Sequence, residues 1–280
     1  MERPVSELAV TAYGPGDAAA AILAVHGITA NGRAWSTVAE HLPDRRILAP
    51  DLRGRGRSNG LSAPYGLRTH AADLAAVLDD DGGGARTVLG HSMGAFVAVA
   101  LAALRPDLVD RLVLVDGGLP LRLPAGAGSA DDLDIRALLG RAAERLTMRF
   151  ADDEEYLEFW RRHPAFARDW SDAVADYARY DLDGTRPSTV PEAMIADGAE
   201  LYGPAWFVDA LRGLRMPVTV LRAPRGLTDT EPLYAAGALE AFRELVPQLD
   251  VVEVDDVNHY TILFAPRGAS RVAAAAASAP

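Results

Sequence analysis

Short apolar segments alternate with longer stretches of helical character along most of this 280-residue chain. Six segments are predicted to be strands, and most are apolar at consecutive positions, as expected for strands covered on both faces. They are residues 20–27, 46–51, 87–92, 111–118, 217–224 and 250–256. Residues 6–14 could add one or two edge strands. The stretches between the strands space their apolar residues as helices do; they are 32–42, 69–80, 94–106 and 234–246. Alternation of this kind indicates parallel strands joined by crossover helices, an α/β fold.

The alternation stops between about residues 119 and 206, where charged and aromatic helical segments follow one another without a convincing strand. This stretch is too long for a loop, and the Pro/Gly-rich sequence GGLPLRLPAGAGS leads into it. We interpret it as a helical insertion on the carboxyl side of the sheet. The predicted domains are the first part of an α/β core at 1–119, a helical cap at 120–205 and the second part of the core at 206–280.

Composition excludes several classes of protein. The net charge of −11 disfavours a protein that binds nucleic-acid backbones, which needs a basic face, and it argues against anionic membranes. The absence of cysteine excludes disulfides, thiolate catalysis and cysteine-based metal sites. No apolar run reaches the roughly 20 residues that span a bilayer, and the first residues lack the pattern of a secretion signal. We expect a cytoplasmic protein whose partner is a small molecule, with no nucleic acid and no membrane; its oligomeric state is left open.

The sequence TVLGHSMGAFVAVALA, residues 87–102, places a serine between two glycines where a buried strand turns into a buried helix. Gly90, Ser92 and Gly94 match the G-x-S-x-G pattern of a nucleophile elbow. The turn forces the serine into a strained conformation and holds its hydroxyl clear of the backbone, while the glycines allow close backbone approach. The N-terminus of the following helix favours a developing oxyanion. The alternative is a tight turn with a capping serine, which the strand–turn–helix context disfavours.

A second motif, His26-Gly27, ends an earlier apolar strand. A loop N–H at this place can point at the same oxyanion, so we predict an oxyanion hole formed by the backbone N–H groups of Ile28 and Met93. His26 itself is interpreted as a structural histidine that bonds loop backbone, and not as the catalytic base.

Four segments in this order resemble the α/β-hydrolase superfamily: HGI at 26–28, PDLRGRGRS at 50–58, GHSMGA at 90–95 and DVNHYTI at 256–262. The resemblance covers most of residues 20–118 and 207–270. It implies an α/β-hydrolase fold, a mostly parallel eight-stranded sheet with helices on both faces and an inserted helical cap. It also implies a serine–histidine–acid triad that needs no metal and no organic cofactor.

The base that accepts the serine proton is predicted to be His259, in the polar loop after the last strand, where the family keeps its histidine. His91 adjoins the serine, but its side chain is expected to point away from the elbow. His41 and His70 are expected on helix surfaces, and His163 lies in the insertion.

The acid has two candidates. Most relatives carry it a few residues past the seventh strand, but here Arg225 and the next two residues offer no carboxylate, and the first one downstream is Asp229. Asp116 directly follows the strand beside the nucleophile strand, where some family members place the acid. The sequence favours Asp116 and keeps Asp229 as the alternative; Asp116 could instead be only a turn residue.

The predicted reaction is hydrolysis of a carboxylic ester or lactone through an acyl-enzyme on Ser92. The insertion is rich in aromatic residues, which suggests an apolar or aromatic small molecule bound by Trp160, Trp170 and Tyr177. The arginines at 53, 55 and 57 are expected to be solvated or paired. The same machinery could cleave thioesters or carbon–carbon bonds. A non-catalytic small-molecule receptor on a hydrolase scaffold is the alternative from another class.

Overall fold

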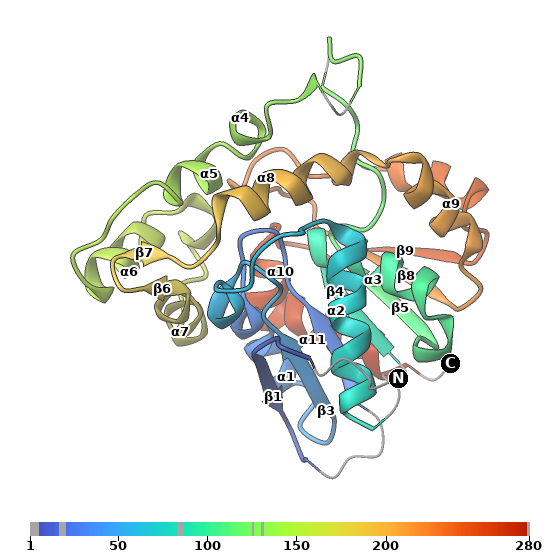
Figure 1. The fold of residues 1–280 in the computed structure, drawn as a ribbon, viewed down its shortest axis with the longest axis horizontal. Helices are drawn as coiled ribbons and strands as arrows, with labels where there is room; N and C mark the ends of the chain where they lie inside the picture. The colour runs from blue at the N-terminus through green and yellow to red at the C-terminus, as the bar shows by residue number, and fades with distance from the viewer. Residues whose placement is uncertain (1–5, 17–20, 83–86, 125, 130–131, 279–280) are drawn as a thin grey trace.

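Seven strands form one sheet in the order β1-β3-β2-β4-β5-β8-β9 (Figure 1). The computed structural model describes residues 6–16, 21–82, 87–124, 126–129 and 132–278. The strands are β1 Val10–Tyr13, β2 Ala21–Val25, β3 Arg46–Pro50, β4 Thr87–His91, β5 Arg111–Val115, β8 Val218–Arg222 and β9 Leu249–Glu253. β1 pairs antiparallel with β3, and the other pairs are parallel. The α/β-hydrolase fold is confirmed, as are all six predicted strands. The described residues give seven strands where eight were expected, because the stretch 6–14 supplies a single edge strand.

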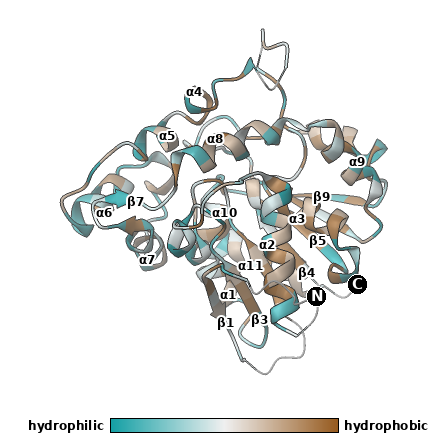
Figure 2. Cartoon of the chain, viewed as in Figure 1, coloured by the Kyte–Doolittle hydropathy of each residue, from teal (hydrophilic) through white to brown (hydrophobic). Residues whose placement is uncertain are grey.

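Both faces of the central strands β2, β4 and β5 are buried, which explains their consecutive apolar positions. In β2, Leu23 and Val25 pack on one side of the sheet, while Ile22 and Ala24 pack on the other. Helices α2 (Leu67–Asp80), α3 (Met93–Leu104) and α9 (Ala205–Gly213) pack together on the first side. Helices α1 (Ser36–Glu40), α10 (Thr261–Phe264) and α11 (Pro266–Ala277) cover the second. Figure 2 shows the apolar strands enclosed between these layers.

The nucleophile helix α3 is apolar almost all round because it has no solvent face over most of its length. Its residues Met93 to Ala102 are all buried, as expected of a helix enclosed by α2, α9 and the sheet. The predicted helix at 234–246 forms instead as a 3₁₀ helix, η7, over Ala238–Glu244. Gly237 precedes it in the left-handed region at φ 75° and Pro247 follows it, so few residues remain for an α-helix.

The chain between β5 and α9 forms a helical segment, defined here as residues 135–202. Its helices are α4 Ile135–Leu139, α5 Arg141–Arg145, α6 Asp153–Arg161, α7 Asp172–Asp181 and α8 Pro191–Ala199. Side-chain caps start three of them: Asp134 accepts from the Ala137 N–H at α4, Asp152 from the Glu155 N–H at α6, and Ser171 from the Val174 N–H at α7. A small hairpin, β6 Leu182–Asp183 with β7 Arg186–Pro187, corrects the expectation of no strand in this stretch. In Figure 1 the segment, green to yellow, lies over one end of the sheet.

The remaining helical turns are 3₁₀ helices. They are η1 Gly32–Trp35, η2 Gly56–Ser58, η3 Pro106–Leu108, η5 Pro164–Phe166 and η6 Glu200–Tyr202. Within the described part of the chain, no helix is both long enough and apolar enough to cross a membrane.

Candidate active site

The sheet register brings the ends of three parallel strands to one edge. Gly90 pairs with Val25 across β4 and β2, and Val115 pairs with His91 on one side and with Leu221 on the other. The residues that follow these strands therefore leave the sheet at the same level. Ser92 follows β4 and donates its N–H to Val115 O at 2.9 Å, while Asp116 follows β5 and donates its N–H to Leu221 O at 2.7 Å.

Ser92 occupies the sharp turn that the sequence predicts. Its φ and ψ are 54° and −125°, a positive φ that a non-glycine residue rarely adopts, and α3 begins at the next residue. The flanking glycines are required by close backbone contacts: a Cβ on Gly90 would lie 2.4 Å from Gly94 O, and one on Gly94 would lie 2.1 Å from Val25 O. The serine conformation is thus held by its surroundings, as strained functional residues are.

The side chains of His259 and Asp116 contact each other. His259 Nδ1 lies 2.6 Å from Asp116 Oδ2, and Asp116 is fully buried. The other carboxylate oxygen of Asp116 accepts the Ala223 N–H at 3.1 Å, which fixes the carboxylate plane. An acid in this position holds the proton on the imidazole Nδ1, and Nε2 is left free to accept a proton.

Asp229, the alternative acid, lies elsewhere. Its Oδ1 accepts from Arg225 Nε at 2.7 Å and from Asn258 Nδ2 at 2.9 Å, and its side chain is 31% exposed. No contact joins it to His259 in the described structure. Of the two carboxylates that the sequence left open, the structure brings Asp116 to the imidazole.

The backbone of His259 is positioned by His91. His91 Nε2 lies 2.8 Å from His259 O, and the two rings have centroids 4.6 Å apart. Burial, aided by the nearby His259, holds the pKa of His91 well below its usual value. His91 is therefore neutral, and its Nε2–H donates to the carbonyl. The expectation that His91 points away from the elbow is wrong: its ring lies against the candidate base.

His26 has the structural role that the sequence predicts. Its Nδ1 lies 2.8 Å from Gly27 O, and its Nε2 accepts the Leu52 N–H at 2.9 Å. Burial lowers the pKa of His26 to about 4, so the ring is neutral and its proton sits on Nδ1. The imidazole thereby ties the loop after β2 to the loop after β3.

Two buried arginines hold successive carbonyls of the loop after β2. Arg55 Nε donates to Ile28 O at 3.0 Å, and an Arg145 guanidinium N–H donates to Thr29 O at 3.1 Å. Each arginine is paired with a buried aspartate of the helical segment: Arg55 with Asp197 at 2.5 Å, and Arg145 with Asp181. The loop that carries Ile28 is therefore anchored to both the core and the helical segment.

Sequence reasoning missed this arrangement. Asp197 also accepts from His70 Nε2 at 2.9 Å, so His70 is fully buried and not on a helix surface as expected. Burial alone would raise the pKa of Asp197, but Arg55 and His70 hold it below its ordinary value. The spacing of these residues in the sequence did not indicate a buried ion pair, because charged residues of a helix are usually solvated. Arg53 is paired with Asp73 at 2.8 Å, in line with expectation.

Ser92 and His259 line a small cavity of about 30 Å³. Ile28 and Tyr177 line it as well, which places two further predicted residues at the site. Trp160 lines an adjoining chamber. Trp170 lines neither cavity: its ring packs against Phe166 and under the Arg161 guanidinium. The contact of Trp170 with substrate therefore stays a prediction that neither cavity supports. Among the described residues, no group of three or more His, Asp or Glu side chains is arranged to hold a metal.

Comparisons with known proteins agree with this fold. The family model described as "alpha/beta hydrolase fold" matches residues 20–266. Lipase LipV of Mycobacterium tuberculosis is 46% identical over 117 residues, which are 42% of this chain and 44% of LipV. The chain thus matches less than half the length of that relative.

Two relatives match over most of their length. 2-(Acetamidomethylene)succinate hydrolase of Mesorhizobium japonicum is 30% identical over 88% of this chain and 83% of its own. N-Formylmaleamate deformylase of Pseudomonas putida is 31% identical over 85% of this chain and 81% of its own length. A crystal structure of E-2-(acetamidomethylene)succinate hydrolase superposes with a TM-score of 0.74 at 28% identity, over 94% of this chain and 92% of that one. The chain is therefore a hydrolase that belongs to the α/β-hydrolase family.

Proposed function

We propose that the protein hydrolyses a carboxylic ester of a small molecule through an acyl-enzyme on Ser92. The observation that carries this proposal is the 2.6 Å contact of His259 Nδ1 with the buried Asp116, beside a serine held at a positive φ in the same cavity. A nucleophile, a base and a group that orients the base are the three parts that acyl transfer by a serine needs.

In the proposed reaction, Ser92 Oγ attacks the ester carbonyl while His259 Nε2 accepts the serine proton. Asp116 stabilises the imidazolium that forms. The tetrahedral intermediate then collapses, the bond to the leaving alcohol breaks, and His259 returns its proton to the alcohol oxygen. A water molecule, deprotonated by His259, attacks the acyl-enzyme in the same way and releases the carboxylic acid and free Ser92.

The oxyanion of each intermediate is proposed to lie between the backbone N–H groups of Ile28 and Met93. Ile28 lines the cavity of Ser92, and Met93 is the first residue of α3, where backbone N–H groups have no intrahelical acceptor. Loss of one such donor typically raises the barrier by about 2.7–4 kcal/mol. The contacts of Arg55 and Arg145 to the carbonyls of Ile28 and Thr29 support a loop that needs no rearrangement during the reaction.

An amide is the second candidate for the scissile bond. It is favoured by the two relatives that match over most of their length, whose names specify an acetamido compound and a deformylation of an N-formyl compound. The residues proposed above would perform the same steps, with the leaving nitrogen protonated by His259 in place of an oxygen. Lactones and thioesters are further acyl compounds that this chemistry admits.

The size of the cavity supports a small substrate. Its lining next to Ser92 is mostly apolar, with Leu139, Ala142 and Leu227 facing it. The proposed substrate therefore presents a compact apolar group to the serine, held under a cap formed by residues 120–205. Tyr177 and Trp160 would contact it from that cap.

A panel of short esters, lactones, thioesters and N-acyl amides, matched in acyl chain, tests the proposal. We expect the purified protein to turn over esters or amides of short acids at rates above those of the Ser92→Ala variant by at least about 10³-fold. Release of the free acid is measured by chromatography. Turnover that persists unchanged in Ser92→Ala, or a folded wild-type protein inactive on every class, would contradict it.

A further inference from the structure

The cavity at Ser92 adjoins a larger chamber of about 270 Å³. Leu139, Ala142, Leu227 and Tyr260 line both spaces, so the two lie side by side. The cavity at the serine holds little more than the reacting carbonyl. A substrate larger than this would extend toward the neighbouring chamber, whose side chains would then decide which substrates fit.

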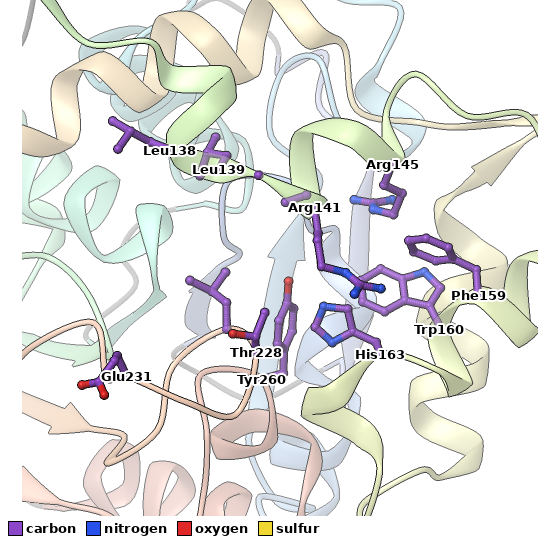
Figure 3. Close-up of a pocket in the computed structure, with 13 residues that line it drawn as sticks. Leu138, Leu139, Arg141, Arg145, Phe159, Trp160, His163, Thr228, Glu231 and Tyr260 are labelled. Carbon is purple, nitrogen blue, oxygen red and sulfur yellow. The ribbon is translucent and has the colours of Figure 1, made fainter. Parts of the chain in front are cut away.

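One cation that lines the chamber has no ion-pair partner among the residues that the structure describes. Arg141, at the start of α5, lines it and makes no hydrogen bond or ion pair with any described residue. The charge of Arg141 helps to lower the pKa of His163, so the guanidinium lies near that ring. In Figure 3 the Arg141 side chain descends into the chamber toward His163 and Trp160. The other arginine of the chamber, Arg145, is already neutralised by Asp181.

His163 supplies a neutral donor beside this cation. Its Nδ1 accepts the Ala165 N–H at 3.3 Å. Burial, with smaller effects of Arg141 and Arg145, lowers the pKa of His163 to about 4. At neutral pH the ring proton is therefore on Nε2, which has no acceptor among the described residues. A guanidinium next to a free N–H donor is a set of groups that suits a carboxylate, because hydrogen bonds to charged oxygens are strong.

The acidic groups of the chamber do not cancel this charge. Glu231 is the one carboxylate among its lining residues, and Figure 3 shows it at the opposite end from Arg141. On its other side Arg141 lines a groove that also contains four carboxylates, those of Asp152, Glu154, Glu155 and Glu158. Glu154 pairs with Arg161 and Glu158 pairs with Arg162, while Asp152 and Glu155 accept backbone N–H groups. None of the four makes an ion pair with Arg141 in the described structure, so its guanidinium can interact with a ligand.

We propose that the chamber is a carboxylate subsite and that the substrate is a small ester or amide carrying a carboxylate group at some distance from the scissile bond. The role of this subsite in hydrolysis rests on the proposed function of Ser92. Arg141 binds the carboxylate by charge-assisted hydrogen bonds, and His163 Nε2–H donates to it. The apolar residues shared by the two spaces contact the chain between the carboxylate and the reacting carbonyl.

Two isosteric substrate pairs test the subsite. Monomethyl glutarate is compared with methyl 5-methylhexanoate, which places the carboxylate on the acyl side. 4-Acetoxybenzoate is compared with 4-isopropylphenyl acetate, which places it on the leaving group. We expect the wild type to prefer the charged member of at least one pair in kcat/KM. Arg141→Gln should lower that ratio roughly 10-fold, and Arg141→Lys should lower it less.

The matched control is Arg149→Gln, an exposed arginine of the same segment that contacts Thr185 and lines neither space; it should leave the ratio unchanged. A binding assay separates this inference from the proposed function. Glutarate titrated calorimetrically into Ser92→Ala should bind, and adding Arg141→Gln should weaken that binding about 10-fold. No glutarate binding, or ratios and affinities unaffected by Arg141→Gln, would overturn the subsite whether or not Ser92 is the nucleophile.

Discussion

Asp116→Asn is expected to lower kcat by about 10⁴-fold, with a much smaller change in KM. The asparagine keeps the size of the buried side chain and can still accept the Ala223 N–H. However, it removes the charge that stabilises the imidazolium, and its amide favours the wrong tautomer of His259. Steady-state kinetics on the best ester or amide of the panel measures the effect, and circular dichroism checks that the variant is folded.

Asp229→Asn is the matched control for this prediction. Asp229 contacts Arg225 and Asn258 at a partly exposed position and does not reach His259, so its substitution should change kcat by less than about threefold. A large loss in Asp229→Asn together with near-normal turnover in Asp116→Asn would transfer the role of the acid to Asp229.

Arg55→Met is expected to lower the free energy of unfolding by about 3–5 kcal/mol, because it leaves the buried carboxylate of Asp197 without its cation. Arg55 also donates to Ile28 O, so the variant should lose roughly 10-fold in kcat as the loop after β2 loses this anchor. Urea denaturation measures the first effect and kinetics the second.

A double variant separates the effect of Arg55 on the stability of the fold from its effect on the position of the loop after β2. In Arg55→Met/Asp197→Asn the buried charge is gone, and the asparagine can still accept the Gly66 N–H that Asp197 accepts at 2.7 Å. Most of the lost stability should return, while kcat stays low because Ile28 O remains without its donor. Arg33→Met, at an exposed pair with Asp176, should cost less than about 1 kcal/mol. A single Arg55→Met variant as stable as Arg33→Met would contradict the account of a buried anchor.

The fold could be predicted from the sequence because the strands are apolar at consecutive positions. Residues such as Leu23, Val88 and Leu112 are buried with their strand neighbours, and a strand buried on both faces leaves this pattern in the sequence. The number of strands was harder to predict. β1 has only one face against the protein, so its alternating burial gives a weaker signal than that of the central strands.

The candidate triad could be predicted because local sequence fixes most of it. The turn at Ser92 follows from its two glycines, and Asp116 directly follows a strand end that the sheet register aligns with the end of β4. His259 lies in the loop after β9, the last strand of the sheet. The sequence could not decide whether Asp116 or Asp229 is the acid, because the two residues follow strands that are neighbours in the sheet. The distinction depends on which loop the imidazole reaches, and that is a tertiary contact.

The buried ion pairs that anchor the loop after β2, and the arginine that lines the neighbouring chamber, could not be predicted from sequence patterns. Asp197 lies 127 residues past His70, so it meets His70 and Arg55 only in the folded protein. Arg141 lies on a helix of five residues among other charged positions, where an arginine usually points to solvent. Its significance appears only from the chamber that it lines.

The most direct test of the account is the site of covalent reaction with a fluorophosphonate, a reagent that phosphonylates activated serines. After labelling and proteolysis, mass spectrometry should find the adduct on Ser92, and Ser92→Ala or His259→Ala should abolish it. Folded wild-type protein that takes up no reagent would instead favour a non-catalytic receptor. An adduct on another residue, with Ser92 unmodified, would contradict the claim that this hydroxyl is activated by His259.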